Sequence, residues 1–586
     1  MRILLTTLNS KYVHSNLALR YLKACLEQDC LCCETYLKEY TINDNMSGIL
    51  ASVFKAKADV YAFSCYIWNI EQTMEVCENL KKVNPSVVII LGGPEVSYDS
   101  AEIMKNKPFI DFIISGEGEK SIPQLVSTII NRNENYEAIE GLYYRDSEGR
   151  IKDNFEPCLI QDLSEIPSPF QNDLSEYNDK AAYYESSRGC PYNCSYCLSS
   201  TIKGVRYFPM DRVKSDLKNL IDSGAKQVKF VDRTFNCSSE RALEIWKFII
   251  GNNKNTIFHF EIGAHLIDDE MLDFLKQIPE GMFEFEIGIQ STNNAAITEV
   301  GRITDFEKIN SVVNSLSKMN NIHTHLDLIA GLPFEDYKSF GKSFDDVYAL
   351  KPHMLQLGFL KLLKGSKIRN EHKKHEYIFV SKPPYEVLAN KYISYNEIIQ
   401  LKQIEEMLEI YKNSGRFENS LEYLNKIYSS PFKLFENLST FWQERNNHSR
   451  KISQEENYDI LFEFYKKVIN SNIEEFREVL KLDFLLNNFG AKKRLWQRKY
   501  VFSNMKATVK EILNSNDFIL EYCPQIADAG ISERIKKIHF ELFKVNKNNY
   551  YLIMIEKKHE SRGIIKTGYK TIDIKYYKEQ SIEEIV

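Results

Sequence analysis

Short apolar runs separated by helical patterns dominate the first 140 residues of the chain. Strand-like runs occupy residues 3–8, 58–66, 87–97 and 109–119, and residues 16–28 and 70–84 between them have helical spacing. Buried strands that alternate with helices are typical of a parallel sheet covered on both faces, which binds ligands at the carboxyl ends of its strands. We therefore expect an α/β, doubly wound (Rossmann-like) domain over residues 1–140.

A second alternating series follows a connector at residues 141–182, which contains a small hairpin and two closely spaced prolines. Its expected strands are 182–189, 225–232, 257–265, 282–291, 323–331 and 353–362. Six such strands predict a partial βα barrel over residues 183–370, with its functional groups at the carboxyl ends of the strands. Residues 371–586 are rich in Lys, Glu, Leu and Tyr with helical spacing, and 550–558 reads as a strand. We expect a mainly helical C-terminal domain of unknown role.

Composition narrows the class of protein. A chain of 586 residues is too long for a single core, and no apolar run approaches the roughly 20 residues of a membrane span. A net charge of −6 offers no electrostatic signature of nucleic-acid binding, so neither a membrane nor a nucleic acid is an expected partner. The first residues do not resemble an export signal, and a cytoplasmic location would keep the twelve cysteines reduced. Grouped cysteines are then candidate metal ligands.

Three cysteines lie within eight residues of a predicted loop, at Cys190, Cys194 and Cys197. Thiolates are the ligands of iron–sulfur clusters, and three of them on one loop would leave one iron of a 4Fe-4S cluster open to a small molecule. The rival interpretation is a zinc site, which usually requires a fourth Cys or His; Cys237 could supply it only by folding back.

This Cys-x3-Cys-x2-Cys loop after the first barrel strand resembles the hallmark of the radical S-adenosylmethionine (SAM) superfamily. The resemblance implies that the three cysteines hold a 4Fe-4S cluster, that SAM chelates its open iron, and that reductive cleavage yields a 5′-deoxyadenosyl radical. The positions similar to SAM-contacting ones are Tyr196, Asp232, Glu261, Glu286, Gln290 and Ser291. A plain Gly-Gly-Glu turn, which many relatives use for the SAM amino group, is absent, and this contact stays unassigned. Glu261 and Glu286 are equally well explained as polar positions of half-buried strands.

The first strand is not followed by Gly-x-Gly-x-x-Gly, which disfavours a dinucleotide-binding domain. Glycine-rich turns follow later strands of this domain instead. Their order resembles the cobalamin-binding domain that precedes the barrel in one large radical SAM class. The matching positions are Ser64, Gly92, Gly93, Glu95, Gly116 and Glu117. The Asp-x-His-x-x-Gly motif of other cobalamin enzymes is absent. The alternative is a cofactor-free module retained for architecture.

Three functions remain open at this point. The resemblance favours a cobalamin-dependent radical SAM methyltransferase that acts on an unactivated carbon of a small-molecule or peptide substrate. It implies an electron donor such as flavodoxin or ferredoxin. The second hypothesis is a radical SAM enzyme of the same class that catalyses a non-methylating rearrangement or cyclisation. The third is a non-catalytic iron–sulfur or zinc-binding protein.

Overall fold

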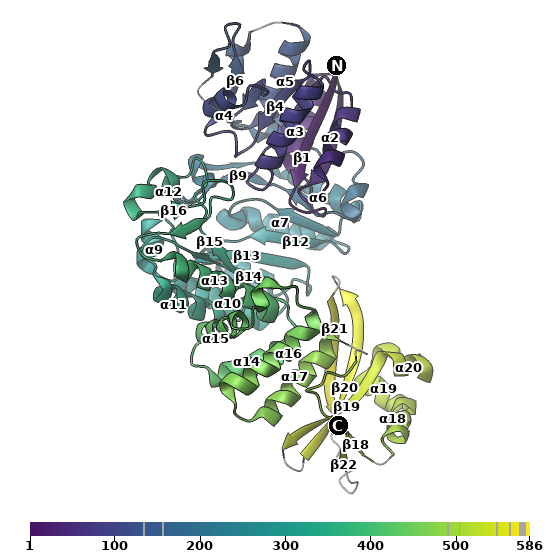
Figure 1. Ribbon diagram of the computed structural model, residues 1–586. Coiled ribbons are helices and arrows are strands. Elements are labelled where there is room, and N and C mark those ends of the chain that lie inside the picture. The colour runs from purple at the N-terminus through teal and green to yellow at the C-terminus, as the bar shows by residue number, and fades with distance from the viewer. Residues whose placement is uncertain are drawn as a thin grey trace. The chain divides into compact units, whose positions relative to one another are not determined.

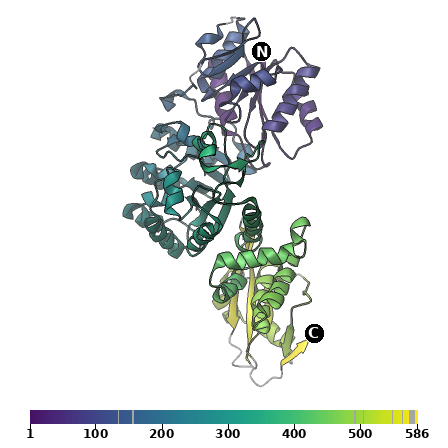
Figure 2. The same cartoon turned by 60° about the vertical axis from the view of Figure 1, so that its left-hand side comes forward.

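The computed structural model describes residues 1–132, 135–154, 157–488, 492–502, 504–546, 549–561, 564–572 and 582–585. The chain divides into two compact units, Met1–Ile398 and Ile399–Val586. The first unit holds both predicted α/β domains (Figures 1 and 2).

The N-terminal domain is built on a sheet in the order β2-β1-β3-β4-β5-β6-β7, of which the first five strands are parallel. These strands are β1 (Arg2–Asn9), β2 (Glu34–Thr41), β3 (Val60–Ser64), β4 (Val88–Gly92) and β5 (Phe112–Ile114). The helices are α1 (Leu17–Asp29), α2 (Met46–Lys55), α3 (Ile70–Val83), α4 (Ser100–Asn106) and α5 (Gly118–Ile130). Separate cores lie on the two faces of the sheet, one with α2, α3 and α4 and the other with α1 and α5. The predicted doubly wound fold is confirmed.

The small hairpin expected in the connector belongs to this sheet. Its strands β6 (Leu142–Arg145) and β7 (Ile151–Asp153) continue the sheet in antiparallel sense from β5, with Ile114 opposite Leu142. Without the hairpin, β5 would be an edge strand with unpaired backbone N–H and C=O groups, and pairing with β6 satisfies them. The sequence predicted the hairpin but not its partner.

The barrel of the second domain is an open, parallel sheet in the order β15-β14-β13-β12-β11-β8. Its strands are β8 (Ala182–Tyr184), β11 (Gln227–Phe230), β12 (Ile257–Glu261), β13 (Phe283–Gln290), β14 (His323–Ala330) and β15 (Met354–Phe359). The covering helices are α6 (Met210–Asp222), α7 (Ser239–Asn252), α8 (Asp269–Leu275), α9 (Asn294–Glu299), α10 (Phe306–Met319) and α11 (Tyr337–Tyr348). Along β13, buried apolar residues alternate with less buried polar or small ones, so polar side chains of this strand share one face.

The predicted strand 182–189 is interrupted in the structure. β8 ends at Tyr184, and β9 (Ser187–Cys190) instead pairs antiparallel with β10 (Gly204–Tyr207). The buried Asp232 carboxylate, just after β11, fixes this break by accepting hydrogen bonds from the Ser186 backbone N–H and from the Ser186 and Ser187 hydroxyls. The result is a hairpin that presents Cys190 at its end.

The second unit begins with helices and ends with strands. Its longer helices include α14 (Glu418–Ile427), α15 (Pro431–Gln443), α16 (Gln454–Phe464) and α17 (Ile473–Asn487). They are followed by an antiparallel sheet of β19 (Ile538–Asn546), β20 (Asn549–Ser561) and β21 (Ile564–Ile572), drawn in yellow in Figure 1. Leu482, Leu485 and Leu486 of α17 pack on buried residues of this sheet. The helical part agrees with the sequence prediction, which foresaw only one of the strands.

Candidate cofactor sites

The cysteine loop is firmly anchored at its centre. Cys194 is 5% exposed, whereas Cys190 and Cys197 are partly exposed. The Ser195 N–H donates to the Val300 carbonyl (2.8 Å), and the Ser195 carbonyl accepts from the Ile368 N–H (2.9 Å). Gly189, with φ +97°, is required before the loop, because a Cβ there would lie 2.1 Å from the Gly204 carbonyl oxygen. The loop conformation is therefore set by the protein scaffold.

The spacing of the sulfur atoms argues against a mononuclear zinc site. Thiolates around one tetrahedral zinc lie about 3.8 Å apart. Among the described residues, no three cysteine sulfurs lie within 4.8 Å of one another, and this holds with Cys237 included. Cys237 instead contacts the Tyr207 hydroxyl at 3.3 Å. A cluster of several irons, which spreads its thiolates more widely, suits this donor set better.

The three cysteines line a cavity of about 190 Å³ at the carboxyl ends of the barrel strands. We call it the cluster cavity. Four predicted SAM-contacting residues share its lining: Tyr196, Glu261, Glu286 and Gln290. Gln290 has φ +72°, and its buried Oε1 has no hydrogen-bond partner among the described residues. The cavity thus combines thiols with polar groups that can still take a ligand.

Two other predicted SAM residues lie outside the lining of the cluster cavity. Asp232 is engaged in the β8–β9 break described above, and the Ser291 hydroxyl donates to the Glu335 carboxylate at 2.5 Å. Both side chains are almost fully buried and bonded to protein groups. Their geometry supports a role in holding the strand ends, and direct SAM contact by either stays a prediction.

A larger cavity of about 570 Å³ lies at the carboxyl ends of the N-terminal strands. We call it the domain cavity, because the barrel residues Tyr183, Glu185, Arg188 and Arg233 also line it. Five of the six predicted cobalamin-contacting residues line it: Ser64, Gly92, Gly93, Gly116 and Glu117. The sixth, Glu95, lies outside; it is 3% exposed and accepts a hydrogen bond from the Tyr385 hydroxyl (2.8 Å).

Tyr66 and Trp68 add a flat aromatic surface to the domain cavity. Their rings stack with centroids 4.5 Å apart and planes 4° from parallel, and Trp68 is 43% exposed. A flat, partly exposed ring pair suits a large planar ligand. Two of the glycines are required by the fold itself: a Cβ on Gly93 would lie 2.6 Å from the Cys65 carbonyl oxygen, and one on Gly116 would lie 2.5 Å from that of Cys158. These glycines are needed because neighbouring turns pack closely, whatever the ligand.

Comparison with known families decides the assignment of both domains. Residues 3–126 match the B12 binding domain, and residues 184–347 match the radical SAM superfamily. Residues 373–565 match DUF4080, a protein family of unknown function. The chain therefore carries a B12 binding domain and a radical SAM domain. The 4Fe-4S cluster, SAM and cobalamin are the cofactors that these two domains imply, and the donor sets of the two cavities fit them.

Curated relatives share these domains at low identity. The 2-(S-pantetheinyl)-carbapenam-3-carboxylate methyltransferase of Streptantibioticus cattleyicolor is 25% identical over 303 residues, covering 48% of this chain and 44% of that protein. The cobalamin-dependent radical SAM methyltransferase TokK of Streptomyces tokunonensis is 25% identical over 346 residues, covering 54% and 49%. The anaerobic magnesium-protoporphyrin IX monomethyl ester cyclase of Rubrivivax gelatinosus is 24% identical over 310 residues, covering 49% and 53%. The chain spans about half the length of these relatives.

A solved structure shows the same fold over most of the chain. The cobalamin-dependent S-adenosylmethionine radical enzyme OxsB, solved with aqua-cobalamin bound, matches with a TM-score of 0.60 at 15% identity. The match covers 82% of this chain and 79% of the OxsB chain. In the part of our protein that the structure describes, no helix has both the length and the apolar character to cross a bilayer.

The pKa values of the two glutamates of the cluster cavity are shifted in opposite directions. Burial raises the pKa of Glu261 to about 7, and the carboxylate of Glu286 adds to the effect. For Glu286, burial alone would raise the pKa, but a hydrogen bond from His259 (3.0 Å) and the charge of Lys229 lower it to about 2. Glu286 is therefore a fixed anion, whereas Glu261 can change protonation near neutral pH.

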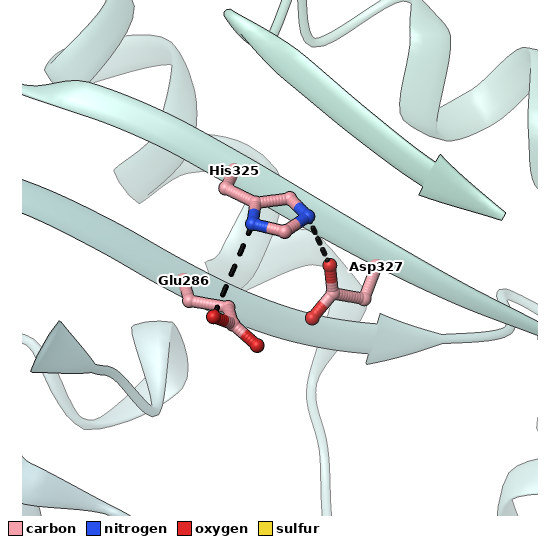
Figure 3. A group of neighbouring side chains, drawn as sticks. All are labelled: Glu286, His325 and Asp327. Atoms are coloured by element: carbon pink, nitrogen blue, oxygen red, sulfur yellow. Dashed lines mark ion pairs between the residues drawn. The ribbon is translucent and has the colours of Figure 1, made fainter. Parts of the chain in front are cut away.

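Glu286 belongs to a row of polar side chains inside the barrel (Figure 3). His325 lies between the two carboxylates, with its Nε2 2.7 Å from Asp327 and its Nδ1 4.0 Å from Glu286. Glu286, His325 and Asp327 are of the types that ligate metals. His259 and Lys229 already balance the negative charge of Glu286, and His325 faces Asp327 and Glu286 through different nitrogens. The charges of this row are therefore balanced by side chains of the protein.

Arg302 is a cavity residue that the sequence motifs did not reveal. Its guanidinium lies 3.9 Å from the Cys194 sulfur and 3.4 Å from the Tyr196 hydroxyl, and it donates to the Gly288 carbonyl. The signal available in the sequence was an arginine after Gly301 at the end of a helical segment, which is too general to single out. Only the fold brings it to the cysteine loop.

Proposed function

We propose that this protein is a cobalamin-dependent radical SAM methyltransferase that acts on an unactivated carbon of a small-molecule or peptide substrate. When bound, the cluster and SAM supply a hydrogen-abstracting radical, and cobalamin supplies the methyl group. The observation that carries the proposal is that Arg233 lines both the cluster cavity and the domain cavity. The two cofactor sites adjoin, so one substrate can face both.

The protein's own groups have separable tasks in this proposal. Cys190, Cys194 and Cys197 hold the irons. Tyr196, Glu261 and Gln290 face the space where SAM would bind, and the Tyr66–Trp68 ring pair offers a surface to the corrin. The exposed Arg233, beside both cavities, is placed to orient a substrate. An electron donor such as flavodoxin or ferredoxin would reduce the cluster.

Two of the relatives named above are methyltransferases, which favours methyl transfer. The cyclase among them keeps a second candidate function, a non-methylating rearrangement or cyclisation with the same cofactors. A non-catalytic binding protein is disfavoured, since the polar groups facing the cluster cavity are intact.

Methyl transfer from SAM to cobalamin distinguishes the first two functions without knowledge of the substrate. Protein loaded anaerobically with cluster and hydroxocobalamin is reduced and given SAM labelled in its methyl group. A methyltransferase forms labelled methylcobalamin and releases S-adenosylhomocysteine. Formation of 5′-deoxyadenosine with no labelled methylcobalamin would instead establish the non-methylating function. Absence of both products from the loaded protein would reject both.

A further inference from the structure

The cluster cavity contains a cation without an anionic partner in the described structure. Arg302 makes its contacts with the Cys194 sulfur, the Tyr196 hydroxyl and the Gly288 carbonyl. Its Nε is buried and has no hydrogen-bond partner among the described residues. None of the ion pairs found among the described residues involves Arg302, whereas other arginines do form them, for example Arg188 with Glu119. A sequestered charge without a counter-ion is costly, so an anion is expected at this site.

The chain could have neutralised Arg302 with a nearby carboxylate but does not. Glu261 and Glu286 line the same cavity, yet neither forms an ion pair with Arg302, and Glu286 is instead paired with Lys229 and His259. Gly301, with φ +68°, turns the chain just before Arg302, and a Cβ there would lie 3.2 Å from the Asn193 carbonyl oxygen of the cysteine loop. The guanidinium is thus held against the loop.

We propose that Arg302 is the counter-cation of the iron–sulfur cluster and raises its reduction potential through the contact at Cys194. A cluster with three thiolate ligands is negatively charged, and each electron it accepts adds to that charge. A cation beside one ligand sulfur stabilises the reduced form more than the oxidised form, since attraction grows with charge. Net charge and hydrogen bonds to sulfur are known determinants of cluster potentials. The proposal rests on the cluster assignment in the proposed function.

The test is a redox titration of the cluster, read by its visible absorbance and by electron paramagnetic resonance, in SAM-free protein. We expect Arg302→Gln and Arg302→Met to lower the ratio of reduced to oxidised cluster at least tenfold at a fixed potential. For one electron, that ratio corresponds to a shift of about 59 mV. Arg302→Lys keeps the charge and should shift the ratio less than threefold.

Arg241→Gln is the matched control. Arg241 belongs to the same barrel, and its guanidinium donates to the Ser186 and Phe208 carbonyls rather than to a cysteine. Its loss should leave the ratio within threefold of the original protein. Iron and sulfide contents are measured in every variant, so that a lost cluster is not mistaken for a shifted one.

The outcomes separate this inference from the cluster assignment. An unchanged ratio in Arg302→Gln and Arg302→Met that retain their cluster overturns the inference, even if SAM binding weakens. Loss of the cluster from both neutral variants, with retention in Arg302→Lys, supports the counter-cation role. Loss from all three variants overturns it, because charge would then not be what matters. Failure of the unaltered protein to take up iron and sulfide would refute the cluster assignment itself.

Discussion

Arg206 on β10 donates two hydrogen bonds to the Glu117 carboxylate at the start of α5, at 2.6 and 2.9 Å. Glu117 also lies 3.6 Å from Arg188, the residue two positions before Cys190. These arginines belong to the hairpin that presents the cysteine loop, and Glu117 lines the domain cavity. The contact therefore connects the domain cavity to the hairpin that presents the cysteine loop. It also gives Glu117 a structural role besides the predicted one toward cobalamin.

We predict that Glu117→Gln lowers the free energy of unfolding of the first unit by about 2–4 kcal/mol, because it leaves the poorly exposed Arg206 guanidinium without its anion. Denaturant unfolding of the full chain, read by tryptophan fluorescence, measures the change. Glu34→Gln is the control, since its pair with Arg2 is largely exposed and is worth less than about 1 kcal/mol. Equal effects of the two substitutions would refute the structural role of Glu117.

Cys194→Ala should abolish iron and sulfide uptake at the loop while leaving cobalamin binding intact, because Cys194 lines the cluster cavity and not the domain cavity. Metal analysis and the brown absorbance of the cluster measure the loss. Cys237→Ala, which removes a thiol outside the cluster cavity, should keep the cluster. A cluster that survives in Cys194→Ala would show that the triplet is not its site.

Glu261→Gln should stabilise the cofactor-free protein at pH 8 and have little effect at pH 4. The pKa of Glu261 in the folded protein is about 7, above the usual 4.5, so the folded state binds the proton more tightly. Stability is then lost as pH rises from about 4.5 to about 7 and stays low above it. The glutamine variant lacks this loss and should gain up to about 3 kcal/mol at pH 8. Unfolding curves at both pH values test it, and a gain that is independent of pH would contradict it.

Trp68→Ala should weaken hydroxocobalamin binding roughly tenfold, because it removes one ring of the stacked pair in the domain cavity, worth about 1.5 kcal/mol. Trp68→Phe should retain most of the affinity. Quenching of tryptophan fluorescence during anaerobic titration gives the dissociation constants. A protein that emerges colourless from desalting after loading would retire cobalamin binding altogether.

The pattern of apolar and polar residues predicted the fold well where the residues of a segment themselves determine its structure. The parallel strands of both sheets, the cysteine loop and the glycine turns of the domain cavity were all visible in the sequence. The break after Tyr184 was not, because it depends on hydrogen bonds to Asp232, 46 and 45 residues beyond Ser186 and Ser187.

Residues that act through distant partners were the hardest to foresee. Arg302 reaches a sulfur 108 residues away in the sequence, and Glu95 turns out to be bound by Tyr385, 290 residues later. Spacing within a motif carries no information about such contacts. Glu117 was singled out for a glycine-rich turn, but its arginine partners lie in a hairpin that the motif does not include.

The central claim is that this chain cleaves SAM reductively at the Cys190–Cys194–Cys197 loop. The most direct measurement is the amount of 5′-deoxyadenosine that the anaerobically reconstituted protein forms from SAM and a strong reductant. We predict 5′-deoxyadenosine in excess of the protein for the unaltered chain and Cys237→Ala, and none for Cys194→Ala. Equal amounts with and without the Cys194 thiol, or none from a protein that holds its full complement of iron and sulfide, would contradict the claim.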